Sequence, residues 1–458
     1  MNYSVILENQ KKYFYSEATK SISFRKKMLK TLKKLILDNE EDILAAVYAD
    51  LKKPDFENQL TETQFTLWEI DYFLKNVLKL AKPQYVETPL FHKPGYSFIK
   101  PEPLGVSLII SPWNYPFQLL MAPLAANIAA GNCTLLKPSE ISPNTSAILA
   151  KLIPQYFNPE YIAIIEGGVS ETSELLKLKF DHIFYTGSSQ VGKIVMTAAA
   201  QNLCPVTLEL GGKSPCVIEE NVPLKQTARK IAWGKFLNAG QTCIAPDYVL
   251  VHESIKNQFV ELLQNTITEF YGENPQNSAH YARIINQRHW QRLTSYLKNA
   301  EIIFGGKSNE EDLFIAPTIV DNPDLSSPLM IDEIFGPILP IITYQKIEEV
   351  AKFINERPKP LAMYVFSKNK RNINYLISRT SSGGMCINDT LSHITSSELP
   401  FGGVGESGMG NYHGKAGFDT FSHYKSIMKK SFLLDFSMKY PPYMKLSPLM
   451  KRVIKWIS

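Results

Sequence analysis

One of the five cysteines lies in a segment suited to nucleophilic chemistry. Cys243 belongs to the loop NAGQTCIAP, residues 238–246, between a predicted helix and a predicted strand. Backbone N–H groups in a glycine-containing loop stabilise a thiolate, which is the reactive form of cysteine. A small buried hydrophobic side chain is the alternative interpretation. The other cysteines lie in apolar runs and are predicted to be core residues: Cys133, Cys204, Cys216 and Cys386.

Glu209 is an acid inside an apolar strand predicted over Val206–Leu210. Burial disfavours the charged carboxylate, so such a group either pairs with a cation or has a raised pKa. A carboxyl group poised in this way serves as a general base near neutral pH. An ion pair with Lys213, four residues along the chain, is the alternative.

Two strand ends carry groups that bind negative charge. Asn114, in the segment WNYP, could donate its amide to a developing oxyanion, although an Asn that completes a loop turn is the alternative. The segment FYTGSSQVGK, residues 184–193, offers backbone N–H groups and a helix N-terminus that suit a pyrophosphate. Its glycine spacing is G-x4-G, so a plain tight turn is the alternative there. Glu333, in the segment EIFGP, is a further candidate for a functional residue. The alternative is that it is a surface acid beside a turn.

These residues need a framework of helices and strands. Residues 4–80 carry apolar side chains at three- and four-residue spacing, which predicts helices, whereas the prolines and aromatics of 83–100 predict an extended arm. Short apolar runs then alternate with helical stretches, which predicts a parallel, doubly wound sheet. The predicted strands of this sheet are Val106–Ile110, Cys133–Leu136, Tyr161–Ile165, His182–Tyr185 and Val206–Leu210.

A second α/β series begins at Pro215, so the simplest division has two α/β domains that join near residue 211. The predicted strands are Cys216–Ile218, Tyr248–Val251, 314–320 and 361–366, and the predicted helices are 224–237 and 254–270.

The composition is that of a globular protein. Of 458 residues 44% are apolar and 20% are charged, which excludes disordered and fibrous classes. The start lacks the apolar core of a signal peptide and the cysteines are few, so we expect a reducing compartment, the cytoplasm. No Cys/His cluster indicates a metal. Residues 103–136 carry no charge, but three prolines interrupt them, so they are not predicted to span a membrane.

Positive charge is concentrated in the C-terminal tail. Residues 425–458 carry eight Lys or Arg against one acid, a net of +7, so the rest of the chain sums to −2. That balance argues against nucleic-acid binding. From Ser447 the tail predicts an amphipathic helix with Trp456 on its apolar side. Such a helix docks on the enzyme's own body or lies on an anionic membrane surface, and both remain open.

Together these segments resemble the aldehyde dehydrogenase superfamily over nearly the whole chain. The motifs SPWNYP, LLKPSE, FYTGSSQVGK, LELGGKSP, GQTC, EIFGP and FGGVGESGMG occur in the family's order. The ending YHGKAGFDTFSHYKS is similar to the class 3 branch of dimeric fatty- and aromatic-aldehyde enzymes. The resemblance implies oxidation of medium- or long-chain aliphatic or aromatic aldehydes to carboxylic acids with NAD, and possible use of NADP.

The resemblance also implies residue roles. Cys243 would form a thiohemiacetal and then a thioester, Asn114 would hold the oxyanion, and Glu209 would activate the hydrolytic water. The cofactor residues implied are Trp113, Lys137, Glu140, Gly187, Ser188, Gly192, Glu333 and Phe335. Two departures from the family pattern, Tyr185 and Asn238-Ala239, are expected to lie away from the catalytic positions.

The implied fold is α/β: a Rossmann-like parallel-sheet cofactor domain, an α/β catalytic domain and a small oligomerisation arm. The implied NAD(P)-binding domain is 1–82 with 101–210, and the catalytic domain is 211–410. Segments 83–100 and 411–430 are expected to bridge two subunits of a homodimer, and 431–458 form the tail. The rival activity is acyl transfer to coenzyme A or reduction of an acyl phosphate, and the presence of Glu209 argues against it. A non-enzymatic relative is the other rival.

Overall fold

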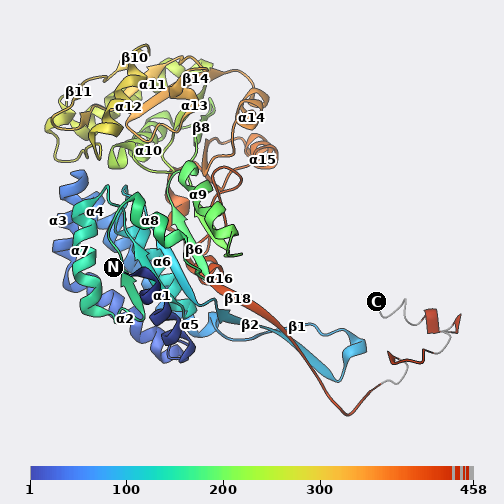
Figure 1. The fold of residues 1–458 in the computed structure, drawn as a ribbon. Helices are drawn as coiled ribbons and strands as arrows, with labels where there is room; N and C mark the ends of the chain where they lie inside the picture. The colour runs from blue at the N-terminus through green and yellow to red at the C-terminus, as the bar shows by residue number, and fades with distance from the viewer. Residues whose placement is uncertain (1, 436–438, 444–446, 449, 453–458) are drawn as a thin grey trace.

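The computed structural model describes residues 2–435, 439–443, 447–448 and 450–452. Within them the chain forms two large sheets, each flanked by helices, and an arm of strands that leaves the body (Figure 1). The chain passes from the first sheet to the second between residues 209 and 215. This is the α/β architecture that the sequence predicts.

Helices at the N-terminal end pack around the first sheet. In α2 the leucines at 29, 32 and 35 are fully buried while the lysines point outward, and the Ser21 side chain caps the helix by accepting the N–H of Phe24 at 3.2 Å. The apolar helix α6 is buried along its whole length, as its lack of charge predicts. These helices are α1 (Tyr3–Tyr15), α2 (Ile22–Asp38), α3 (Glu40–Leu51), α4 (Asp55–Asn58), α5 (Phe65–Leu80), α6 (Gln118–Ala130), α7 (Pro143–Tyr156), α8 (Val169–Leu176) and α9 (Ser189–Ala200).

The first sheet has the strand order β17-β7-β6-β3-β4-β5 and is parallel except for β17. Because parallel strands end at one edge, the loops that follow them converge there. Thr186 and Glu209 are Cα partners in this ladder and lie at the ends of β6 and β7. The strands are β3 (Val106–Ile110), β4 (Cys133–Lys137), β5 (Ile162–Ile164), β6 (His182–Thr186), β7 (Val206–Glu209) and β17 (Gly408–Met409).

The second sheet has the order β10-β13-β14-β9-β8-β15-β16, with β10 antiparallel to the rest. Strand structure predicted near 314–320 is present as two strands, separated by Ala316 and by Pro317, which has no N–H to donate to a ladder. The strands are β8 (Pro215–Ile218), β9 (Tyr248–His252), β10 (Glu301–Phe304), β13 (Thr318–Asp321), β14 (Ile338–Tyr344), β15 (Ala362–Phe366) and β16 (Gly384–Ile387), with the small pair β11 (Ser308–Asn309) and β12 (Phe314–Ile315) beside them. The helices are α10 (Leu224–Phe236), α11 (Lys256–Tyr271), α12 (Gln287–Leu297), α13 (Pro328–Ile331), α14 (Ile347–Asn355) and α15 (Lys370–Arg379).

The arm joins two segments that are far apart in the sequence. Strand β2 (Gly95–Pro103) pairs antiparallel with β18 (Ser422–Lys430) along its whole length, and β1 (Gln84–Val86) pairs with its other edge. The three strands project from the body in Figure 1, and α16 (Gly414–Thr420) connects β18 to the first sheet's helices. Tyr85 and Met428 are exposed on this arm.

The described part of the tail begins a helix where the sequence predicts one. Ser447 accepts the N–H of Met450 on its Oγ at 3.2 Å and the N–H of Lys451 on its carbonyl at 3.0 Å. Leu449 and residues 453–458, which carry most of the predicted apolar face, lie outside the described residues. In the described part of the chain, no helix has both the length and the apolar character that crossing a membrane requires.

Candidate active site

Two cavities meet at Cys243. The apolar cavity has an empty volume of about 1110 Å³, part of it open to solvent, and its walls include Leu60, Phe65, Trp68, Trp233, Ile394 and Phe401. The polar cavity, of about 680 Å³, is lined by Trp113, Asn114, Gly187, Ser188, His289, Glu333 and Phe335 among others. The residues common to both cavities are Leu119, Thr186, Glu209, Leu210 and Cys243. A thiol and a carboxyl group therefore stand where the two spaces join.

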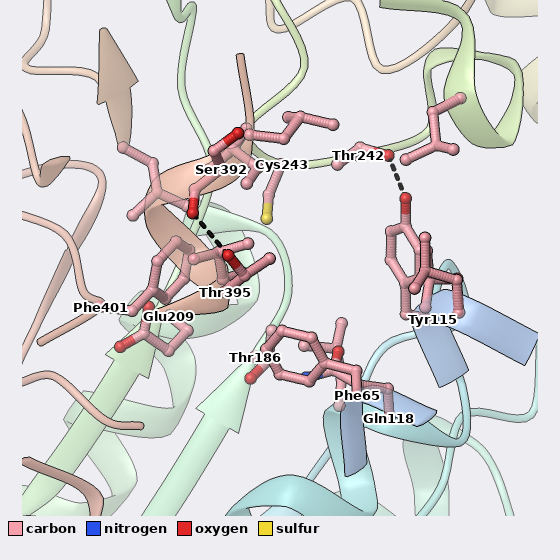
Figure 2. A pocket seen from close by; sticks show the side chains of 18 of the residues that line it. Phe65, Tyr115, Gln118, Thr186, Glu209, Thr242, Cys243, Ser392, Thr395 and Phe401 are labelled. Carbon is pink, nitrogen blue, oxygen red and sulfur yellow. Dashed lines mark hydrogen bonds between the residues drawn. The ribbon is translucent and has the colours of Figure 1, made fainter. Parts of the chain in front are cut away.

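The loop that carries Cys243 follows α10 through a tight turn. Asn238 and Ala239 have φ values of 52° and 51°, and at Gly240 an added Cβ would lie 2.3 Å from the Gly336 carbonyl oxygen. This strained backbone points the sulfur of Cys243 into the apolar cavity (Figure 2). Cys243 is half-buried, as are Cys204 and Cys386, whereas Cys133 and Cys216 are buried, so the prediction of four core cysteines is wrong for two of them.

The electrostatics of the thiol oppose ionisation. Burial, followed by the charges of Glu333 and Glu209, raises the pKa of the Cys243 thiol, while the N–H groups of Cys243 and Ile244 lower it. Those N–H groups stabilise a thiolate once it forms. A nucleophilic Cys243 must therefore transfer its proton to a base.

Asn114 is tied to the same loop. Its side-chain Nδ2 donates to the main-chain carbonyl oxygen of Gln241 at 3.0 Å. The main-chain carbonyl oxygen of Asn114 accepts a hydrogen bond from Asn238 Nδ2 at 2.9 Å. Asn238 Nδ2 also reaches the Gln241 oxygen at 3.2 Å. The expectation that Asn238 lies away from the catalytic candidates is therefore wrong, since its amide joins the strand end to the cysteine loop.

A buried ion pair contacts the main chain of Asn114. Lys53 Nζ lies 2.5 Å from Glu62 Oε1, both side chains have no exposed surface, and Lys53 also donates to the Asn114 carbonyl oxygen at 3.3 Å. Glu62 stands in a π-helical turn, Gln59–Gln64, and its Oε2 accepts the N–H groups of Phe117 and Gln118 at the start of α6. This pair could not be predicted, because in the sequence its members belong to an ordinary charged helical pattern.

Glu209 is 2% exposed, and neither of its carboxyl oxygens has a hydrogen-bond partner among the described residues. Lys213, the alternative partner, instead bonds Asp247 at 2.5 Å and the carbonyl oxygens of Leu329 and Asp332. The ion-pair alternative is therefore wrong. Desolvation raises the pKa of Glu209 well above its ordinary value, as expected for a carboxyl group without a partner.

Aromatic rings and a carboxyl group form the far wall of the polar cavity. The Trp113 ring lies 4.9 Å from the His289 ring and 5.4 Å from the Phe335 ring. Burial, then the charge of Asp247, raises the pKa of Glu333 to about 8, and an N–H donated by the backbone of Gly212 opposes this. Burial lowers the pKa of His289 to about 4, so its ring is neutral at neutral pH. His289 was not predicted, because a lone histidine on a helix gives no signal.

The glycine-rich turn has little room for side chains. An added Cβ at Gly187 would lie 2.3 Å from the Tyr185 hydroxyl, which itself donates to the Ser188 carbonyl oxygen at 3.4 Å. Ser188 caps α9 by accepting the Val191 N–H at 3.4 Å, and an added Cβ at Gly192 would lie 2.8 Å from the Leu210 side chain. Gly187 and Ser188, the residue that caps α9, thus line the polar cavity.

Lys137 is the last residue of β4, and Glu140 follows the strand at the same sheet edge. Lys137 Nζ lies 3.5 Å from Glu140 Oε2 and donates to the Pro138 carbonyl oxygen at 2.7 Å. Lys137 is buried whereas the Glu140 side chain is 45% exposed, so the carboxylate is open to a ligand. A helix N-terminus, bare glycines and an exposed acid near one edge fit a dinucleotide. Among the described residues no group of three or more His, Cys, Asp or Glu side chains could hold a metal.

The chain belongs to the aldehyde dehydrogenase family, whose family model matches residues 3–427. It is 50% identical over 437 residues to 4,4'-diaponeurosporen-aldehyde dehydrogenase of Staphylococcus aureus, covering 95% of each chain. It is also 50% identical to aldehyde dehydrogenase family 3 member A2 of Mus musculus, over 94% of this chain and 89% of that one. A third relative, the "dimeric NADP-preferring" aldehyde dehydrogenase of Canis lupus familiaris, is 46% identical over 96% of this chain and 97% of its own.

Solved structures agree with this assignment and confirm the α/β fold. The substrate-bound state of Staphylococcus aureus AldH superposes with a TM-score of 0.96 at 48% identity, over 100% of this chain and 99% of that one. A betaine aldehyde dehydrogenase of Staphylococcus aureus in complex with NAD+ superposes with a TM-score of 0.85 at 26% identity, over 95% of this chain and 88% of that one.

Proposed function

We propose that this protein oxidises medium- or long-chain aliphatic or aromatic aldehydes to carboxylic acids with NAD as the oxidant. The observation that carries the proposal is the junction of two cavities at Cys243 and Glu209. One cavity has apolar walls suited to a hydrocarbon chain, and the other has the features of a dinucleotide site. Hydride transfer needs an aldehyde carbon and a nicotinamide side by side, and this junction offers such a place.

Cys243 attacks the aldehyde carbon after its proton has left, which gives a thiohemiacetal. The negative charge that develops on the aldehyde oxygen meets two donors, Asn114 Nδ2 and the backbone N–H of Cys243. One hydrogen of Nδ2 is held by the Gln241 carbonyl oxygen at 3.0 Å, which orients the amide and leaves its second hydrogen for the substrate. The side-chain amide of Asn114 is therefore oriented before the substrate binds.

A nicotinamide cofactor bound in the polar cavity would supply the oxidising power, by accepting the hydride that leaves the substrate carbon. The acyl group is then held on Cys243 as a thioester. Glu209 removes a proton from a water molecule, whose oxygen bonds to the acyl carbon as the carbon–sulfur bond breaks. Burial raises the pKa of Glu209, so its carboxylate binds a proton more tightly than an ordinary carboxylate does. A base in this position supports release of a free acid over transfer to coenzyme A.

The dinucleotide would be held by residues from both sheets. Gly187, Ser188 and Gly192 suit the pyrophosphate, and Lys137 and Glu140 suit the hydroxyls of the adenosine ribose. Trp113, Glu333 and Phe335 would surround the nicotinamide ribose. The exposed carboxylate of Glu140 repels a 2′-phosphate, so NAD is preferred and NADP is tolerated.

Two further features belong to the proposal. The arm formed by β1, β2 and β18 joins two copies of the chain in a homodimer, which agrees with the word "dimeric" in the name of one relative.

The basic tail gives weak, salt-sensitive contact with an anionic membrane surface, which would bring the enzyme to lipid-derived aldehydes.

Two variants test the catalytic proposal. Cys243→Ala should abolish oxidation of decanal, measured by NADH absorbance, and still bind NAD, whereas Cys386→Ala, altered outside both cavities, should keep activity. Glu209→Gln should retain acylation and accumulate a thioester, visible by mass spectrometry after one turnover. Activity in Cys243→Ala, or only unmodified Glu209→Gln after turnover, would refute the assigned roles.

A further inference from the structure

Four buried polar side chains face the apolar cavity without partners. Gln118, Thr186, Glu209 and Tyr412 all line it and are 5%, 7%, 2% and 1% exposed. Gln118 Nε2, Thr186 Oγ1, the Tyr412 hydroxyl and both Glu209 oxygens have no hydrogen-bond partner among the described residues. Leaving such a group unsatisfied costs about 1–3 kcal/mol, and buried polar groups are almost always satisfied by protein or by water. The cluster therefore indicates a small polar guest in this otherwise apolar space.

The side chains of the cluster come from four elements that converge. Thr186 and Glu209 are Cα partners on neighbouring parallel strands, so their side chains stand on the same face of the sheet. Tyr412 lies close enough to Glu209 and Cys243 for both to raise the pKa of its phenol, in addition to the larger effect of burial. The Gln118 amide approaches the Tyr412 hydroxyl and has the opposite effect on that pKa.

The location separates two members from the cofactor. Gln118 and Tyr412 line the apolar cavity and do not line the polar cavity, whereas Thr186 and Glu209 line both. The unsatisfied hydroxyl of Thr186 could therefore bind a small polar molecule in either the apolar or the polar cavity. The unsatisfied atoms of Gln118 and Tyr412 face only the side on which the acyl chain would lie.

Packing fixes Tyr412 and Gln118 in place. The Tyr412 ring lies 5.1 Å from the Phe184 ring, 5.8 Å from the Phe401 ring and 3.9 Å from the His413 ring. The backbone N–H of Gln118 donates to Glu62 at 2.9 Å, which anchors the start of α6. The rings hold the Tyr412 side chain in place, and the bond to Glu62 fixes the backbone from which the Gln118 side chain enters the cavity.

We propose that Tyr412 is a catalytic residue that holds the deacylating water, and that Gln118 is a positioning residue that orients the Tyr412 hydroxyl. This inference rests on the proposed function, because it assigns the water that Glu209 activates. With the water bound, an N–H of Gln118 would donate to the phenolic oxygen and direct the phenolic hydrogen toward the water. The water accepts that hydrogen bond, donates one of its own hydrogens to Glu209, and keeps one lone pair for attack.

The step balances without any change of oxidation state. The water oxygen forms a bond to the acyl carbon of the thioester, and the proton that it loses goes to Glu209. The carbon–sulfur bond breaks, and its electron pair leaves with Cys243 as the thiolate. The products are a carboxylic acid and the free thiolate, so Tyr412 accelerates only the hydrolytic half of the reaction.

Acylation from an activated ester isolates this half. The full-length protein is treated with p-nitrophenyl acetate in the absence of dinucleotide, and the acyl-enzyme is followed by intact mass spectrometry. In Tyr412→Phe and in Gln118→Leu the acylation rate should stay within twofold of the unaltered enzyme, and hydrolysis should slow on the order of 10-fold or more. Added hydroxylamine, which attacks a thioester without a base, should restore release of the acyl group in both variants.

Tyr161→Phe is the matched control. Tyr161 is 2% exposed, its hydroxyl also has no partner among the described residues, and it lines neither cavity, so its variant should hydrolyse at the unaltered rate. Normal hydrolysis in Tyr412→Phe overturns the inference alone, as does equal slowing in Tyr161→Phe or equal slowing of the hydroxylamine reaction. If the unaltered enzyme forms no acyl group on Cys243, the proposed function fails together with this inference.

Discussion

The side-chain amide of Asn238 donates a hydrogen bond to the main-chain oxygen of Asn114 at 2.9 Å. The bond joins the first residue of the cysteine loop to the residue proposed to hold the oxyanion, although 124 positions separate them. Asn238 has a φ of 52°, a conformation that asparagine tolerates better than most residues. The loop of the proposed nucleophile and the proposed oxyanion donor are therefore joined directly by hydrogen bonds.

Replacing this amide with a carboxylate should disturb both partners. Asn238→Asp keeps the shape but sets an acceptor against the Asn114 carbonyl oxygen, which should cost about 1–3 kcal/mol and lower the acylation rate on the order of 10-fold. Asn355→Asp, on an exposed amide that donates to the Arg379 carbonyl oxygen, is the matched control. Single-turnover kinetics and thermal melting measure the two effects. An acylation rate in Asn238→Asp equal to that of the control would contradict the coupling.

Glu57, which accepts a hydrogen bond from the cysteine loop, should make the stability of the protein depend on pH. Burial raises the pKa of Glu57 from 4.5 to about 7, while the Asn238 N–H that it accepts at 3.0 Å and Lys53 oppose the rise. Because the folded pKa is the higher one, the stability contributed by the protonated carboxyl is complete below pH 4.5 and is lost as pH rises through about 7. We expect Glu57→Gln to fall less in melting temperature between pH 5 and pH 7.5 than the unaltered protein. Parallel pH profiles would disprove this.

Cofactor choice should respond to Glu140. Its exposed carboxylate is the group proposed to repel a 2′-phosphate. Glu140→Gln removes the charge and keeps the hydrogen-bonding oxygen, so the ratio of kcat/KM for NAD to kcat/KM for NADP should fall on the order of 10-fold, in line with the removal of one close charge. Glu160→Gln, on the exposed loop before β5, is the control and should leave the ratio unchanged. A ratio that favours NADP in the unaltered enzyme would overturn the prediction.

The arm should control assembly. Val86 and Met428 are exposed apolar residues on its outer strands, so lysines at both positions would place charge in the proposed interface. We expect the unaltered chain to be a dimer by light scattering at micromolar concentration and Val86→Lys/Met428→Lys to be a monomer. Leu203→Lys, at a residue that is 92% exposed elsewhere on the body, should stay dimeric. A monomeric unaltered chain would refute the homodimer.

The tail should control attachment to lipid. We expect the full chain to sediment with vesicles that contain phosphatidylserine at low salt, and to be released as salt screens the charges. Truncation after Tyr443 should abolish sedimentation and leave aldehyde oxidation in solution intact. Equal sedimentation of both proteins would exclude a role for the tail.

Residues within short motifs could be predicted from the sequence, whereas contacts between distant segments could not. Cys243 and Glu209 can be identified from their local sequence, because Cys243 lies in a glycine-containing loop and Glu209 lies in an apolar strand. Gln118 and Tyr412 meet only because α6 and the segment before α16 pack against one sheet, and an isolated Gln and Tyr carry no pattern. The Lys53–Glu62 pair could not be predicted for the same reason, since a lysine in a loop and a glutamate in a helical turn usually face solvent.

The pairing of β2 with β18 has a consequence for synthesis of the chain. Gly95–Pro103 leaves the ribosome more than 300 residues before its partner, Ser422–Lys430, exists. Until the last strand emerges, the early one presents unpaired backbone groups on an open edge, and the interface proposed on it is incomplete. A nascent or prematurely ended chain therefore lacks the surface for joining a second copy, so assembly would serve as a check that translation has run to its end.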